Sequence, residues 1–394
     1  MNPDLLAWLN LSIRWLHLTA GIAWIGASFY FVWLDNNLAE PDPPREGVKG
    51  ELWAVHGGGF YHSQKYLNAP PQMPGHLHWF KWEAYTTWLS GFALLIVLYY
   101  WQAPIYLIDG ARMALTQPQA ILTGLGFILG GLAVYEAICR SPLGRNPRVF
   151  GVIWFACLTA ATYALTHIFT DRGAFIHVGA IIGTAMVGNV FIVIIPNQTK
   201  IVKTMLAGGT PDPRLGAMGK QRSVHNNYMT LPVLFIMISN HYPMVTSHKL
   251  AWLLLAMLGA AGVSIRHFFS LRHFGKVRME FLFYAFMLIY TTAVISAFTG
   301  APRGPARDVS FSEARAIIDK HCLACHSATP THKGIPMAPN GTSYDTTEEM
   351  VKYAPKIFER AVASTSMPLG NETKMTDQER ADLGAWIKAG AKTQ

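Results

Sequence analysis

The chain has 394 residues, of which 51% are hydrophobic and 14% are charged, and its formal net charge is +9. This balance excludes an ordinary soluble globular protein, and the gathering of apolar residues into runs of about 20 indicates a membrane protein. From Val309 onward ten acidic and ten basic side chains cancel, so the positive charge belongs to the first part of the chain. It reflects membrane topology rather than a nucleic-acid surface.

Eight apolar segments are predicted to cross a bilayer as helices, since one span needs about 20 residues. In chain order they cover residues 5–34, 80–101, 119–138, 149–169, 175–195, 224–239, 250–269 and 279–298. The sixth is the shortest and contains Pro232. The first has no basic region before it and is too long for a signal sequence, so it is predicted to be a retained helix.

Lys and Arg are distributed unevenly between the loops that join these segments. Sixteen of them follow the first, third, fifth and seventh segments, whereas the opposite loops contain only Arg112, Arg172 and Lys249. Because basic loops stay on the cytoplasmic side, both termini are predicted to lie outside. For a bacterium this predicts a multi-pass protein of the inner membrane with a periplasmic C-terminal tail.

The character of the sequence changes after residue 299. Residues 300–308, GAPRGPARD, are a linker rich in Pro, Gly and Arg, and residues 309–394 are polar and helix-patterned. The membrane part, 1–299, and this tail are therefore predicted to be separate domains.

The tail contains Cys322, Cys325 and His326 in the spacing Cys-x-x-Cys-His. This is the attachment motif of a c-type haem, in which two thioethers hold the porphyrin and the histidine binds the iron. A redox or zinc pair would use the same two cysteines. The helical pattern FSEARAIIDK before the motif and a capping box from Thr376 to Glu379 favour a small class I cytochrome c domain.

A methionine is predicted to be the second axial ligand of this haem. Met367, which precedes Pro368, supplies a thioether, and a His/Met pair raises the reduction potential, as suits an electron acceptor. Met375, in NETKM, is the competing ligand. Covalent haem attachment takes place in the bacterial periplasm, in agreement with the loop charges.

Histidines are frequent in the membrane part, which holds twelve of the fifteen. Ionisable groups at membrane depth suggest a functional site. In the first segment Arg14, His17, Gly21 and Trp24 share one helix face, so His17 is a candidate ligand of a non-covalent haem b, with Arg14 available to an anionic group. The alternative is a histidine hydrogen-bonded between packed helices, with the glycine there for close packing.

Two further histidines, His167 and His177, lie near the outer ends of the fourth and fifth segments. They could serve a haem b near the periplasmic face, and otherwise they are polar residues of the membrane interface. Cys139 and Cys157 lie in helices without a partner motif and are interpreted as ordinary small residues.

Two stretches on the inner side, residues 55–83 and 223–232, are rich in polar and aromatic side chains. They contain His56, Tyr61, His62, Lys65, His76, His78, Lys81, Glu83, His225, Asn226, Asn227, Tyr228 and Thr230. Together these supply the amides, cations and stacking rings that hold a planar, anionic heterocycle. The alternative is a structured loop at the membrane interface.

The chain resembles the membrane-bound bacterial urate oxidases, in which an eight-helix membrane domain is fused to a cytochrome c. The matching stretches are IRWLHLTAGIAWIG, HGGGFYHSQKYLNAPP, HNNYMTLPVLF with SNHYP, and the tail from HCLACHS through SMPLGNETKMTDQER. The resemblance implies an all-α fold, a polytopic membrane helix bundle of about eight helices followed by a small cytochrome c domain. It also implies that urate is oxidised to 5-hydroxyisourate and that the electrons enter the respiratory chain.

Urate at neutral pH is a monoanion, which a basic cytoplasmic face would attract. Its oxidation needs a general base, for which the candidates are His56, His62, His78, His225 and Glu83. The residues expected to bind urate are Arg14, Lys65, Tyr61, Asn226, Asn227 and Tyr228. The other expected partners are the lipid bilayer and, as electron acceptor, a soluble cytochrome c or a terminal oxidase.

A urate site on the inner side would lie most of a bilayer away from Cys322 and Cys325. We therefore expect a second redox centre, most simply a haem b with His17 as the first candidate ligand. Without it, the urate site must lie near the periplasmic face, around His167, His177 and His241.

Two other functions fit parts of the sequence. A respiratory cytochrome subunit would take electrons from quinol or a partner dehydrogenase and use the inner loops for docking. A haem or metal transporter would use the first segment, which resembles the HemJ and CopD-like membrane families, with the tail as a redox sensor. The histidine-rich inner stretch and the resemblance favour the enzyme.

Overall fold

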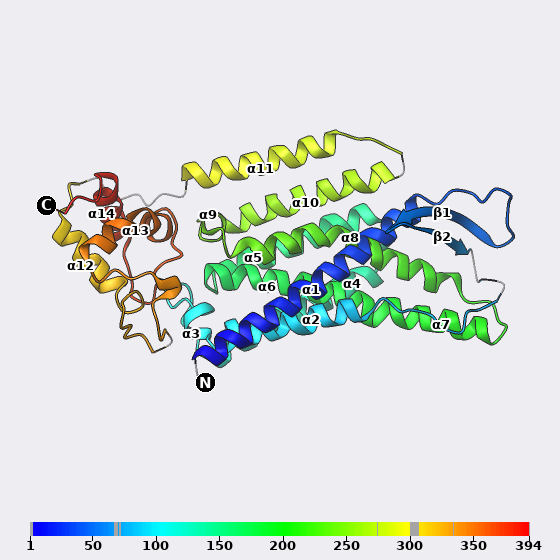
Figure 1. The fold of residues 1–394 in the computed structure, drawn as a ribbon, viewed down its shortest axis with the longest axis horizontal. Helices are drawn as coiled ribbons and strands as arrows, with labels where there is room; N and C mark the ends of the chain where they lie inside the picture. Colours follow the sequence, from blue (N-terminus) through cyan, green and yellow to red (C-terminus); the bar gives the residue numbers. More distant parts are fainter. Residues whose placement is uncertain are drawn as a thin grey trace.

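The computed structural model describes residues 3–66, 70, 72–273, 275–299, 307–333 and 335–393. Long helices run side by side along the long axis of the molecule (Figure 1). The C-terminal unit lies at one end of this bundle, beside α3 (Ala103–Tyr106) and α9 (Pro243–Thr246), and a β-hairpin lies at the other. These ends are called the tail end and the hairpin end.

All eight predicted segments are helical. They correspond to α1 (Pro3–Asn36), α2 (Trp82–Leu95) with the π-helical η1 (Ile96–Tyr100), α4 (Gln117–Arg140), α5 (Pro147–Thr166), α6 (Asp171–Gly188) with η3 (Asn189–Ile194) and α7 (Ile195–Leu206), α8 (Pro213–Ser239), α10 (Ala251–His273) and α11 (Glu280–Thr299). Within the described residues, six of these helices are long and apolar enough to cross a membrane. The chain is thus a multi-pass membrane protein. That α2 and α8, whose first turns are polar, also cross the membrane stays a prediction.

The bundle is centred on α6. The elements α6, η3 and α7 form one continuous helix, and 61% of its most apolar 18-residue stretch is buried inside the protein. In α1 none of the corresponding stretch is buried. Apolar helices gain little from each other in lipid, so close packing decides their contacts. At Gly131 of α4 a Cβ would lie 2.6 Å from Ile181 of α6, so only glycine allows this approach.

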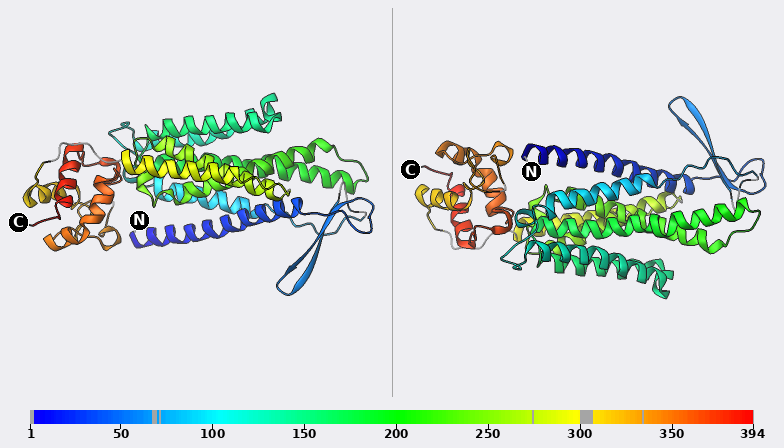
Figure 2. Two further views of the ribbon diagram at one scale, coloured as in Figure 1. Left: turned by 90° about the horizontal axis from the view of Figure 1, so that it is seen from above. Right: turned by 90° about the horizontal axis from the view of Figure 1, so that it is seen from below.

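The segment after α1 departs from the predicted all-α fold. Strands β1 (Val48–His56) and β2 (Gly59–Tyr66) pair antiparallel, with His56 opposite Gly59. Between them Gly57 and Gly58 have φ of 59° and 80°, as a two-residue hairpin turn requires. Figure 2 shows the hairpin projecting away from the helices.

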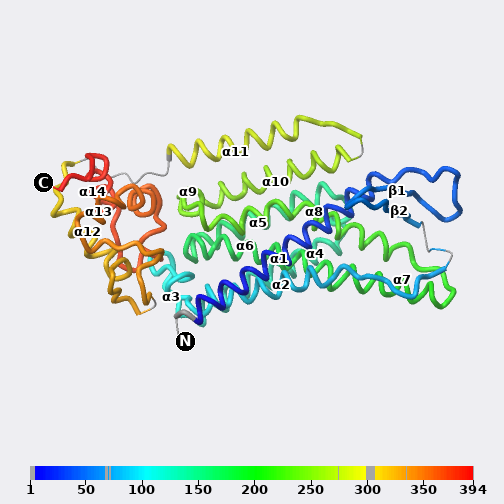
Figure 3. Tube along the Cα trace, in the orientation of Figure 1, coloured from blue at the N-terminus to red at the C-terminus, as the bar shows by residue number. Residues whose placement is uncertain are grey.

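The basic loops and the C-terminal unit lie at opposite ends of the bundle. The connections from α1 to α2, α7 to α8 and α10 to α11 are at the hairpin end, as the tube in Figure 3 makes clear. Two of the sixteen counted residues are buried inside the bundle, since Arg222 of α8 and Arg266 of α10 are 2% and 5% exposed. The remaining fourteen still exceed the three at the tail end, while orientation in the bilayer stays a prediction.

The C-terminal unit is built from α12 (Phe311–His321), α13 (Thr347–Ile357), η5 (Phe358–Val362) and α14 (Asp377–Lys388) around its own apolar core. The predicted capping box exists, because the Thr376 N–H donates to Glu379 Oε2 at 2.7 Å. Phe311 of α12 packs on Trp386 of α14 with 6.2 Å between ring centroids. Of the predicted linker, residues 300–306 lie outside the described residues.

Candidate haem site and buried polar clusters

The Cys-x-x-Cys-His motif forms a tight turn after α12. The N–H of His326 donates to the carbonyl oxygen of Cys322 at 2.8 Å, and that of Cys325 to the same oxygen at 3.2 Å. Both cysteines are free thiols. Burial raises the pKa of the Cys325 thiol and raises that of Cys322 to about 12. Such thiols stay protonated, which disfavours a reactive dithiol centre.

The His326 ring is oriented by its own hydrogen bond. Nδ1 donates to the carbonyl oxygen of Thr342 at 2.9 Å, and the ring lies 5.0 Å from that of Tyr344. A metal-binding histidine commonly donates its second nitrogen to a carbonyl, leaving Nε2 for the metal. Within the described residues no group of three His, Cys, Asp or Glu side chains could hold a metal ion, so a zinc site finds no further ligands there. The three motif residues fit a covalent haem c.

The two candidate axial methionines have different surroundings. Met375 is 3% exposed and belongs to the apolar core of the C-terminal unit. Met367 is half-buried, and its loop is held at both backbone groups, because its N–H donates to the Arg360 carbonyl at 2.9 Å and its carbonyl accepts from Arg380 at 2.6 Å. Met375 therefore has a packing role that Met367 lacks.

His17 lies between α1 and α2. Its Nδ1 is 2.9 Å from the Thr87 carbonyl and 3.1 Å from Ser90 Oγ. A Cβ on Gly91 would lie 2.9 Å from the ring, so Gly91 makes room for it, whereas a Cβ on Gly21 would meet Thr87 at an ordinary 3.9 Å. This is the arrangement of a histidine hydrogen-bonded between packed helices. Because both bonds use Nδ1, Nε2 stays available to a haem b.

The remaining candidates at the tail end are not gathered around one space. His177 is fully buried, with Nδ1 bonded to the Gly173 carbonyl at 2.7 Å and Nε2 3.2 Å from the Tyr100 hydroxyl. Both of its nitrogens are engaged, so His177 does not fit a haem ligand in this packing. His167 is exposed and bonds to the Tyr163 carbonyl at 2.7 Å. His241 is exposed at the end of α8.

The two inner stretches that were expected to act together are separated. His56, Tyr61, His62 and Lys65 are on the projecting hairpin, where His62 bonds to Glu51 at 2.9 Å and stacks on Trp53 at 4.2 Å. Lys65 pairs with Asp35. This part of the prediction therefore agrees with the alternative of a structured interfacial loop.

Nearer the bundle, His78 packs edge-on against Phe80 at 4.6 Å between ring centroids. Glu83 is in the first turn of α2, where its buried Oε2 has no hydrogen-bond partner within the described chain. Arg14 bonds to Asn10 on the exposed face of α1 at 3.3 Å.

The second inner stretch enters the bundle and divides between two clusters. One, called the Arg222 cluster, consists of Tyr135, Glu136, Asn189, Arg222, His225 and Asn226. Arg222 donates to both oxygens of Glu136 at 2.8 and 3.1 Å and to Asn189 Oδ1 at 3.1 Å. The sequence-based site included only His225 and Asn226. Glu136, an acid within a predicted span, was the signal for the others.

Hydrogen bonds inside the Arg222 cluster form a consistent chain. Asn189 donates to the Tyr135 hydroxyl at 2.8 Å, so that hydroxyl can donate onward to His225 Nδ1 at 2.9 Å. Asn226 accepts from Asn189 at 2.7 Å. The His225 ring also stacks on Phe150 at 3.9 Å. The basic nitrogen of His225 is thus occupied within the protein, and the cluster's main charge is neutralised by Glu136.

The other cluster, called the Arg266 cluster, consists of Phe29, Tyr228, Arg266, His267 and Phe281. The Arg266 guanidinium lies over the Phe29 ring at 4.2 Å, and Tyr228 bonds to His267 Nδ1 at 2.6 Å. Arg266 Nε and Nη2 are buried without a hydrogen-bond partner in the described part of the chain. Neither Phe29 nor Arg266 was predicted as a site residue, and Arg266 was counted among the basic loop residues that follow the seventh segment.

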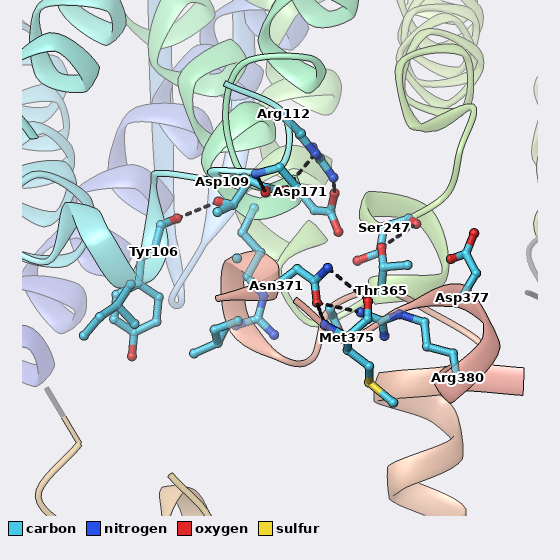
Figure 4. Close-up of a pocket in the computed structure, with 17 residues that line it drawn as sticks. Tyr106, Asp109, Arg112, Asp171, Ser247, Thr365, Asn371, Met375, Asp377 and Arg380 are labelled. Carbon is cyan, nitrogen blue, oxygen red and sulfur yellow. Dashed lines mark hydrogen bonds and ion pairs between the residues drawn. The ribbon is translucent and has the colours of Figure 1, made fainter. Parts of the chain in front are cut away.

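A cavity of about 230 Å³ lies where the C-terminal unit meets the bundle (Figure 4). Gly370 touches the bundle there, since a Cβ on it would lie 3.0 Å from the Ile108 carbonyl, and Thr365 donates to the Ser247 carbonyl at 3.3 Å. Arg112 pairs with Asp109 and Asp171 on the cavity wall. The loop around Met367, residues 365–371, therefore contacts the bundle.

One family model, described as urate oxidase N-terminal, matches residues 3–297. The match covers the bundle and the hairpin and ends before the tail. Comparison with curated proteins found no match, and neither did comparison with solved structures. The interpretation of the tail accordingly depends on its motif and geometry.

Proposed function

The chain belongs to the urate oxidase N-terminal family, and on this premise we propose that it oxidises urate to 5-hydroxyisourate and passes the electrons to a c-type haem in its own tail. Family membership makes the protein an oxidoreductase with urate as a plausible substrate. The observation that carries the rest is the His326 ring, held by Thr342 beside two free thiols at haem-attachment spacing.

The reaction must release two electrons and one proton for each urate monoanion that takes up one water. The haem supplies one-electron acceptance, so two transfers are needed per turnover. The chain's own residues must bind the anion, admit the water that is added and accept the proton. Of the predicted bases, His225 is bonded to Tyr135 in the Arg222 cluster, and His56 and His62 lie on the projecting hairpin, where His62 is bonded to Glu51.

The tail's position supports electron entry from the bundle. Its loop 365–371, which contains the proposed ligand Met367, contacts α3 and the Ser247 carbonyl. We place this end in the periplasm of a bacterial inner membrane on the loop charges, and propose a soluble cytochrome c or a terminal oxidase as the next acceptor. A haem b between the urate site and the tail remains part of the proposal, with His17 as the better-fitting ligand.

Met367 is proposed as the axial ligand, and its replacement tests this directly. Met367→Ala should lower the reduction potential of the haem by on the order of 100 mV, because the thioether favours the reduced iron. Met375→Ala is the matched control. It should leave the potential nearly unchanged while destabilising the tail by roughly 2–5 kcal/mol, as expected for a buried core methionine. Redox titration measures the potential, and thermal unfolding measures the stability. If the potential falls in Met375→Ala and not in Met367→Ala, Met375 is the axial ligand.

The function itself is tested by adding urate anaerobically to the purified protein and recording reduced-minus-oxidised spectra with a pyridine haemochrome assay. We expect urate to reduce a c-type haem and a b-type signal to accompany it. Reduction of c-type haem alone would remove the haem b and move the urate site to the tail end. If quinol reduces the haem and urate does not, the protein is a respiratory cytochrome subunit.

A further inference from the structure

We propose that the Arg266 cluster is the binding site for the urate monoanion, with Arg266 as its counter-charge. This inference rests on the proposed function and adds the location and chemistry of the site. The cluster lies in the hairpin half of the bundle, between α1, α8, α10 and α11.

The first step is the unpaired charge. Arg266 is 5% exposed, and in the described residues it forms no ion pair and leaves Nε and Nη2 without hydrogen bonds. A buried guanidinium without an anion is costly, since it loses its hydration and gains no compensating charge. Phe29 offers only a ring face at 4.2 Å, which compensates part of that loss. The arrangement therefore calls for an anion that the chain does not supply.

The Arg222 cluster provides an internal comparison. There the same residue type, at a similar depth in the same bundle, receives a bidentate carboxylate from Glu136. At Arg222 the fold itself supplies the acid that compensates the buried charge. At Arg266 it supplies aromatic rings instead, which points to a ligand rather than to packing.

The surrounding groups match a planar, anionic oxopurine. The guanidinium has two free donors on one edge, which can meet adjacent carbonyl and ring-nitrogen acceptors. Phe29 and Phe281 provide aromatic surface. The Tyr228 hydroxyl and the His267 ring, which are bonded to each other at 2.6 Å, provide polar groups. Asn227, one residue before Tyr228 on α8, has a buried Oδ1 without a partner in the described chain.

The test measures urate binding by equilibrium dialysis on the full-length holoprotein, together with the KM for urate-driven haem reduction. Arg266→Gln should weaken urate binding and raise KM at least thirtyfold, while ascorbate still reduces the haem as in the wild type. Arg272→Gln removes an exposed charge from the same helix and should stay within twofold. Arg266→Lys keeps a positive charge in the bundle but loses the paired N–H donors of the guanidinium. It should therefore fold and bind urate several-fold more weakly than the wild type.

Unchanged urate binding in both Arg266 variants overturns the site. A second outcome also overturns it. If an anionic phospholipid copurifies with the wild type and is lost in Arg266→Gln while urate binding is unaffected, the anion at Arg266 is a lipid headgroup. Dialysis also separates this inference from the proposed function. If wild-type protein binds urate through Arg266 yet transfers no electrons to the haem, the site stands and the reaction fails.

Discussion

Replacing both Cys322 and Cys325 by alanine is expected to abolish covalent haem and reduce urate-dependent electron delivery to an added cytochrome c to background. The two sulfurs are the proposed thioether attachment points, and without them no covalent bond joins the porphyrin to the chain. Haem staining after denaturing electrophoresis measures attachment. The rate of reduction of the added cytochrome measures transfer.

Cys157→Ala is the matched control, because Cys157 lies in α5 without an attachment motif. It should retain the haem and a rate within twofold of the wild type. A small dye that accepts electrons directly from the bundle shows whether the double variant still folds and binds urate. Wild-type transfer to cytochrome c in the double variant would mean that electrons leave the bundle without using the tail.

Hydropathy alone was sufficient to locate the long helices, because lipid requires every backbone group in a span to be bonded within its own helix. The hairpin over 48–66 was missed, although it carries a recognisable signal. Gly57 and Gly58 separate two stretches with strand-forming residues, as in a two-residue hairpin. The histidines and aromatic residues of that stretch instead suggested a binding loop.

The buried clusters could be predicted only in part. The sequence pattern placed His225, Asn226 and Tyr228 at a site, but it could not show that α8 presents them to different neighbours. Asn226 meets η3, whereas Tyr228 meets α10. Charge counting assigned Arg222 and Arg266 to loops, since a helix end cannot be located to within a turn by hydropathy. Their burial depends on which helices pack beside them, and no single segment contains that information.

The tail was more predictable because its chemistry is local. The spacing of Cys322, Cys325 and His326 predicts a haem attachment, which stays a proposal, whereas the capping box, which needs only four consecutive residues, is confirmed. The partner of His326 was not predictable, since Thr342 is sixteen residues away and meets the ring only in the folded tail.

The second large effect concerns the Arg222 cluster. Glu136→Gln should destabilise the protein by about 3–5 kcal/mol, because it leaves Arg222, 2% exposed, without its bidentate carboxylate. Unfolding in detergent, followed by heat or by a denaturing surfactant, measures the loss. Arg140→Gln is the control, since Arg140 bonds to the same carboxylate at 3.1 Å with its side chain 66% exposed. Its cost should stay below about 1 kcal/mol.

A double variant separates structure from function in this cluster. Glu136→Gln combined with Arg222→Met should be more stable than Glu136→Gln alone, because the uncompensated charge is gone and an apolar side chain fills its space. Urate binding by the folded double variant should then remain close to that of the wild type. If it is lost while stability is regained, Arg222 and not Arg266 is the residue that receives the anion, because only a binding role survives the repair of the fold.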